Sequence, residues 1–202
     1  NVDLNKFSVN ACDQYSAEPA YWEDVKNHVG ESPSSLNMIV PEAFLGETDE
    51  KEVTDTIKAY LDNGTLKSIG KGFVYVHRET SSGIRRGLVA AFDIAEYGKL
   101  IRPTEKVVKE RLPERIKIRK DAILEMPHGL VLINDIKNEL FTMLDKYVEN
   151  RKTLYDFNLY PSNQNIKGWF INEKEIINSI FDILSSLIFN DMLYAIGDGN
   201  HS

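Results

Sequence analysis

The stretch GFVYVHRETSSGIRRGLVAAFDI, residues 72–94, contains the clearest strand signal in the sequence. Two segments rich in β-branched and aromatic residues, Gly72 to Arg78 and Gly87 to Ile94, flank a turn-forming run from Thr80 to Gly83. Such residues fit a pleated, half-buried surface, whereas serine and glycine favour tight turns. The sequence therefore predicts an antiparallel β-hairpin around residues 72–94.

Helical patterns and shorter strand-like runs lie on both sides of this hairpin. Apolar residues recurring every three or four positions, with proline or glycine near the ends, predict helices at 19–29, 50–61, 138–148 and 173–189. Pro103 is expected to open a further helix. Short apolar runs predict strands at 7–12, 36–40, 130–133, 153–159, 168–171 and 192–196, with 130–133 expected to be buried. The expected fold is α/β, a mixed sheet with flanking helices.

The sequence predicts a single α/β domain or the N-terminal part of a larger protein. A weak seam is expected near residues 64–71, where Gly64, Gly70 and Gly72 interrupt the pattern. The last predicted strand is followed by six residues that include two glycines. Because such a loop normally leads into another element, we expect the chain to be truncated before its C-terminal part.

Composition narrows the class of protein. With 42% hydrophobic and 27% charged residues, the 202-residue chain is typical of globular proteins. No stretch has the length and apolarity of a membrane span, and the net charge of −7 argues against general nucleic-acid binding. The single cysteine, Cys12, fits a reducing compartment. We therefore expect a cytoplasmic protein without a membrane partner; its oligomeric state stays open.

The C-terminal residues 197–202 form the first candidate site. A strand followed by a glycine-rich loop and then a helix is a layout in which backbone N–H groups converge on an anion. His201 could act as a general base, and Asp198 could orient it or hold a metal of unknown type. The remaining candidate ligand-binding residues of the loop are Gly197, Gly199, Asn200 and Ser202. An ordinary turn with a helix cap is the alternative.

A second candidate site lies at Arg102, Thr104 and Glu105. The arginine could bind a phosphate or carboxylate in a bidentate manner, and the glutamate could serve as a base or metal ligand. Thr104 would present its hydroxyl beside free backbone donors at the helix start expected after Pro103. Capping of that helix is the alternative interpretation of Thr104 and Glu105.

Two further groups could bind a polar ligand. Arg111 and Arg115 recur at a spacing of four within 106–120, a segment with seven Lys or Arg and two Glu. They could bind phosphate, or they could form a solvated helix face. Asp13 and Gln14 follow the strand predicted at 7–12, and strand ends are where α/β proteins bind ligands.

Several blocks together resemble domain-of-unknown-function family 1015 of bacteria and archaea. The blocks are YAIGDGNHS at 194–202, whose end is similar to the family's DGHHR- or DGNHS-type loop, and ACDQYSAEPAYWEDV, LNMIVPEAFL, RRGLVAAFDIAEY, IRPTEKVVKERLPERIKIRKDA and LEMPHGLVLINDI. The resemblance covers essentially the whole chain. It implies a loop similar to that of the chromosome-partitioning-protein and sulfiredoxin superfamily, which includes nucleotide-binding members and a free-serine kinase. That loop usually carries a basic residue where this chain has Ser202, so Arg102 or segment 106–120 would supply the positive charge.

Three functions remain open at this point. The first is a small-molecule enzyme that binds a nucleotide or phosphorylated anion and, as a kinase-like phosphotransferase, transfers a phosphoryl group to a small hydroxylated metabolite. It would use ATP or ADP with Mg²⁺. The alternatives are a non-catalytic regulatory or DNA-associated module and a metal-assisted hydrolase that uses Asp198 and His201.

Overall fold

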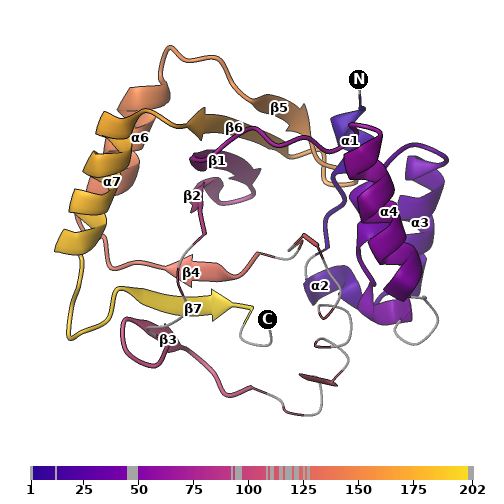
Figure 1. Ribbon diagram of the computed structural model, residues 1–202, viewed down its shortest axis with the longest axis horizontal. Helices are drawn as coiled ribbons and strands as arrows, with labels where there is room; N and C mark the ends of the chain where they lie inside the picture. The colour runs from indigo at the N-terminus through magenta and orange to yellow at the C-terminus, as the bar shows by residue number, and fades with distance from the viewer. Residues whose placement is uncertain are drawn as a thin grey trace. The chain divides into compact units, whose positions relative to one another are not determined.

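The computed structural model of the chain describes residues 2–11, 13–44, 50–91, 93, 97–107, 109, 112–113, 116, 120, 123–124, 126 and 128–199. The chain divides into two compact units (Figure 1). The first consists of Asn1–Ile69, Lys117–Met126 and Phe157–Ile166; the second consists of Gly70–Ile116, Pro127–Asp156 and Lys167–Ser202. Among the described residues, no helix has the length and apolarity that crossing a membrane requires.

The first unit is built from helices: α1 (Leu4–Phe7), α2 (Asp13–Ser16), α3 (Pro19–Val29), η1 (Ser35–Met38), η2 (Glu42–Phe44) and α4 (Glu50–Asp62). The predicted helices at 19–29 and 50–61 are confirmed as α3 and α4. Pro19 occupies the first turn of α3, and Gly30 ends it with a φ of 58°, a conformation that favours glycine. Two buried clusters hold the unit together: Trp22, Val25, Val29 and Leu36 form one, and Met38, Val53 and Ile57 form the other.

Two predicted strands of this unit are wrong. The described part of 7–12 forms no strand, because Phe7 belongs to α1 and Val9 makes only a single bridge to Tyr160. Instead of a strand at 36–40, the chain forms the 3₁₀ helix η1, because the buried Ser34 hydroxyl accepts a hydrogen bond from the Leu36 N–H. At η1 a polar cap outweighs the strand propensity of the following residues.

The predicted hairpin is present in a four-stranded sheet with strand order β2-β1-β6-β5. Strands β1 (Phe73–Thr80) and β2 (Gly83–Val89) pair antiparallel, with Thr80 opposite Gly83. The second strand starts earlier than predicted and ends at Val89, because the turn contains only Ser81 and Ser82 and Gly83 adopts a φ of 124°. The strands predicted at 153–159 and 168–171 are confirmed as β5 (Tyr155–Asn158) and β6 (Asn165–Ile171).

The helices α6 (Glu139–Val148) and α7 (Lys174–Ser186) confirm the predictions at 138–148 and 173–189. Their apolar side chains form the largest buried cluster of the described residues, together with side chains of β1 and β6. Its buried members are Tyr75, Leu140, Leu144, Val148, Trp169, Ile171 and Ile180.

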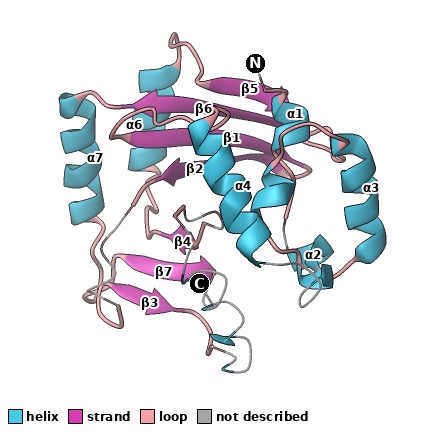
Figure 2. Ribbon diagram, turned by 45° about the vertical axis from the view of Figure 1, so that its right-hand side comes forward, coloured by secondary structure: helices cyan, strands magenta, loops and turns pink. Residues whose placement is uncertain are grey.

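A separate three-stranded sheet has the order β3-β7-β4 (Figure 2). Its strands are β3 (Ile101–Pro103), β7 (Tyr194–Asp198) and β4 (Leu130–Leu132). The protein therefore has a mixed α/β fold, as the sequence predicts.

Three details of this sheet differ from the prediction. Pro103 ends a strand rather than opening a helix, because the segment from Ile101 to Pro103 pairs with β7. The strand predicted at 192–196 is present as β7, but it spans Tyr194–Asp198. The strand β4 was expected to be buried, yet Leu130 and Leu132 are 46% and 52% exposed.

Candidate functional site

The carboxyl ends of two parallel strands meet at one edge of the three-stranded sheet. Strands β3 and β7 run parallel, with Pro103 opposite Ile196. The residues that follow, Thr104 on one side and Asp198 on the other, are therefore carried to the same edge. The Thr104 hydroxyl donates a 2.6 Å hydrogen bond to the Ile196 carbonyl and ties the two strand ends together. Ligands of α/β proteins bind outside the carboxyl ends of such strands, so this edge is the candidate site.

A β-bulge at Gly197 determines the direction of the Asp198 side chain. Leu130 pairs with Asp198 and Val131 with Ile196, so Gly197 is an extra residue between these pairs. Side chains alternate along a strand, and a bulge shifts that alternation by one residue. Asp198 therefore lies on the same face as Leu130, which is the exposed face of the sheet.

The partner strand lies close to the glycine at the bulge. A Cβ atom at position 197 would lie 3.2 Å from the Leu132 side chain and 3.6 Å from the Leu130 carbonyl oxygen. Gly197 is thus part of β7, rather than of a loop beyond the strand as the sequence predicted.

The backbone N–H of Gly199 already has an anionic partner. Gly199 adopts a φ of 90°, and its N–H donates a 2.6 Å hydrogen bond to Oδ1 of Asp198. In the described part of the chain, the second carboxylate oxygen, Oδ2, has no hydrogen-bond partner. The exposed Asp198 therefore keeps one oxygen available for a cation.

Arg102 lies on the exposed face and is held by main-chain carbonyls. It pairs with Ala195 in the register of β3 and β7, on the face that also carries Leu132. Its guanidinium donates to the Lys99 carbonyl at 3.0 Å and to the Asn190 carbonyl at 2.8 Å. An arginine has five N–H donors, so this fixed side chain can still donate to an anion.

His128 is a residue of this edge that sequence reasoning missed. Since β4 runs antiparallel to β7, its N-terminal end lies where β7 ends, and Leu130 pairs with Asp198. A Cβ atom at Gly129 would lie 3.8 Å from the Asp198 carbonyl oxygen. The exposed His128 precedes that glycine. A usable signal was present, since a His-Gly pair directly precedes an apolar strand in MPHGLVL.

Comparison with family models identifies the chain. The family described as "Protein of unknown function (DUF1015)" matches residues 2–202. The chain belongs to this family. Comparisons with curated proteins and with solved structures found no match. The resemblance seen in the sequence blocks is thereby confirmed at the level of the DUF1015 family.

The other predicted site residues of this DUF1015 protein lie elsewhere or outside the described residues. Asp13 and Gln14 begin the short helix α2 of the first unit rather than following a strand. Glu105 is exposed and directly follows Thr104. The predicted residues that lie outside the described part of the chain are Asn200, His201, Ser202, Arg111 and Arg115. Within the described ranges, no group of three or more His, Cys, Asp or Glu residues is arranged to hold a metal ion.

A second polar cluster of the DUF1015 protein is centred on Asp145 of α6. Its carboxylate accepts hydrogen bonds from the Tyr75 hydroxyl at 2.7 Å, from His77 Nε2 at 3.0 Å and from Arg86 at 2.6 Å. Burial alone would raise the pKa of the Asp145 carboxyl, but the hydrogen bonds from Tyr75 and Arg86 outweigh it and hold that pKa below its ordinary value. Burial and the bond to Asp145 raise the pKa of the Tyr75 phenol. The cluster connects β1 and β2 to α6, so we assign it a structural role.

Proposed function

We propose that this DUF1015 protein binds a nucleotide or another phosphorylated small molecule at the sheet edge where β3 and β7 end. We further propose that it transfers a phosphoryl group to a small hydroxylated metabolite. The observation that carries the proposal is the parallel pairing of β3 with β7, which brings Thr104, Glu105, Asp198 and Gly199 to one edge. Ligand binding at the carboxyl ends of neighbouring parallel strands is the general pattern in α/β proteins.

The occupied N–H of Gly199 affects how phosphate would be held. A phosphate cannot take the position of the Asp198 carboxylate without displacing it, and two anions at one amide repel each other. A divalent cation removes this conflict, because Mg²⁺ is usually bound by one or two carboxylates together with substrate phosphates. Oδ2 of Asp198 and the carboxylate of Glu105 are the protein oxygens that would hold it. We therefore propose that a nucleotide binds as its magnesium complex.

Arg102 and His128 would supply the remaining functions of the edge. Arg102 is held rigidly by two carbonyls, so it would approach a phosphate without losing side-chain freedom on binding. His128 could accept the proton of the attacking hydroxyl, a role for which histidine is suited near neutral pH. Both assignments depend on a ligand binding at this edge.

Isothermal titration calorimetry with ADP and ATP, with and without Mg²⁺, tests the binding step. We expect binding in the presence of Mg²⁺, and the Asp198→Asn variant should bind about tenfold more weakly, a loss of about 1.4 kcal/mol. The matched control is Asp182→Asn, an exposed carboxylate on α7 that should leave binding unchanged. Absence of heat and of thermal stabilisation with either nucleotide would refute the proposal.

We also infer a cytoplasmic location from the single cysteine of the chain, because a reducing compartment gives no advantage to paired cysteines.

A further inference from the structure

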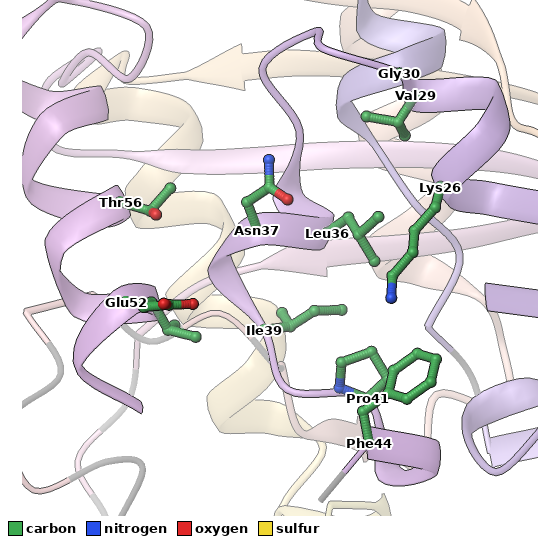
Figure 3. Close-up of a pocket in the computed structure, with 11 residues that line it drawn as sticks. Lys26, Val29, Gly30, Leu36, Asn37, Ile39, Pro41, Phe44, Glu52 and Thr56 are labelled. Atoms are coloured by element: carbon green, nitrogen blue, oxygen red, sulfur yellow. The ribbon is translucent and has the colours of Figure 1, made fainter. Parts of the chain in front are cut away.

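A pocket of about 510 Å³ lies within the first unit, between α3, η1 and α4 (Figure 3). Its size falls in the range of small-molecule sites, roughly 300–1,000 Å³. Leu36, Ile39, Pro41, Phe44 and Val53 form the apolar part of its lining. No residue of this pocket takes part in the site at the sheet edge, so it requires an explanation of its own.

The pocket carries one positive and one negative side chain. Lys26 enters from α3 and Glu52 from α4, and Figure 3 shows them on opposite sides with Ile39 between them. The ammonium of Lys26 lies 4.2 Å from the centre of the Phe44 ring, a cation–π contact. Among the described residues, Glu52 makes no hydrogen bond and no ion pair. The two charges therefore do not neutralise each other across the pocket.

Two neutral polar side chains line the same space. The Asn37 amide donates a long 3.4 Å hydrogen bond to the Tyr60 hydroxyl, which leaves its carbonyl oxygen available as an acceptor. Thr56 of α4 supplies a hydroxyl on the side of Glu52 (Figure 3). An amide and a hydroxyl can both donate to and accept from a peptide group. The pocket thus has a charged side chain on each of two sides and neutral hydrogen-bonding groups in addition.

This arrangement restricts the ligand chemistry. A simple anion would be attracted by Lys26 and repelled by Glu52, whereas a simple cation would be attracted by Glu52 and repelled by Lys26. A free α-amino acid carries both charges on one carbon and cannot place them on opposite sides of Ile39. An uncharged apolar ligand would leave the charged pair unused and would desolvate it at a cost.

We propose that this pocket binds a short linear zwitterion with an apolar body, of which an apolar dipeptide is the representative. Its ammonium would face Glu52, its carboxylate would face Lys26, and its side chains would cover Leu36, Ile39 and Phe44. Asn37 would bind the central peptide group. The site is independent of the proposed nucleotide site, so either proposal can fail without the other.

Calorimetric titration of the complete chain with leucyl-leucine tests the proposal, with free leucine, N-acetyl-leucyl-leucine and leucyl-leucine amide as comparison ligands. We expect the dipeptide to bind more tightly than all three. Removing one charge from either partner should weaken binding about fivefold, the upper range for an exposed ion pair. The acetylated ligand should show no further loss with Glu52→Gln, nor the amide with Lys26→Met, because the same ion pair is already absent.

The control variant is Lys58→Met, which removes an exposed lysine on α4 outside the pocket. It should bind leucyl-leucine as the unmodified protein does, and the thermal unfolding midpoints of all three variants should match that of the parent. Failure of the dipeptide to bind at millimolar concentration would overturn the proposal. Equal binding by free leucine, or unchanged binding in both Glu52→Gln and Lys26→Met, would overturn it as well.

Discussion

The two sheets of this protein differ in how their apolar side chains are covered. In the four-stranded sheet, Tyr75 and Ile171 are fully buried against α6 and α7. In the three-stranded sheet, Ile101 is buried, but Leu130 and Leu132 are about half exposed on the opposite face. Parallel strands are normally covered on both faces. The comparison indicates that the four-stranded sheet is packed into a buried core, whereas one face of the three-stranded sheet is left exposed.

Truncating one leucine that packs in each sheet should give the largest difference in the free energy of unfolding. Leu144→Ala opens a cavity beneath a fully buried side chain of α6 and should lower the free energy of unfolding by about 3 kcal/mol. Leu132→Ala removes a half-exposed side chain of β4 and should cost less than about 1 kcal/mol. Urea denaturation of both variants measures this, and equal losses would contradict the comparison.

Adding a methyl group at one glycine in each sheet tests the same difference in packing, because it adds atoms where the leucine variants remove them. A Cβ at Gly168 of β6 would overlap with the half-buried ring of Tyr155 on the neighbouring strand β5, so Gly168→Ala should cost about 2 kcal/mol. At Gly197 the Cβ would meet the half-exposed Leu132, which can turn away, so the cost should stay below about 1 kcal/mol.

Gly87→Ala is the control for both glycine variants, because nothing lies within 4 Å of its added Cβ. Thermal unfolding should show Gly87→Ala equal to or above the parent protein. A larger loss at Gly197 than at Gly168 would show that the three-stranded sheet is the more tightly packed of the two.

The Asp145 cluster should give a smaller effect that depends on pH. Asp145→Ala leaves Tyr75, His77 and Arg86 without their common acceptor, and because the site is partly exposed it should cost about 1.5 kcal/mol near pH 7. The pKa of this carboxyl is lower in the folded protein than its ordinary value of about 3.9. Its stabilisation is therefore fully present above that ordinary value and is lost as the pH falls through the lowered one.

Urea titrations at several pH values between 7 and 3 measure the difference between parent and variant. The difference should be constant down to about pH 5 and should shrink below about pH 4. A difference that stayed constant across the whole range would mean that the Asp145 charge does not stabilise the fold.

The sequence was most informative where periodicity and packing agree. The helices α3, α4, α6 and α7 and the β1–β2 hairpin all form, and each of these helices buries part of its apolar face, so local preference and tertiary contacts point the same way there. Prediction failed where one polar contact or one pairing partner outweighed local preference. Ser34 converts an apolar run into a 3₁₀ turn, and β7 draws Pro103 into a strand. Neither effect can be read from the neighbouring residues alone.

Part of the candidate site could be predicted from the sequence, because Asp198, Gly199 and Thr104 were selected for their chemistry and lie at the edge of one sheet. Their arrangement in space could not be predicted. That Gly199 donates to Asp198 depends on the backbone conformation at two residues, and that His128 lies near them depends on antiparallel pairing across more than sixty positions. Side-chain chemistry is local in the sequence, whereas strand register is a long-range property.

The unpaired position of Gly197 sets the side of β7 on which Asp198 emerges. If Gly197 occupied a regular paired position, Asp198 would lie two positions beyond Ile196 and would share the face of Ile196 and Ile101. Deleting Gly197, by contrast, would place Asp198 directly after Ile196 and would leave it on the face of Leu130. The pairing of one glycine, rather than the chemistry of the edge residues, thus decides from which side the aspartate can be reached.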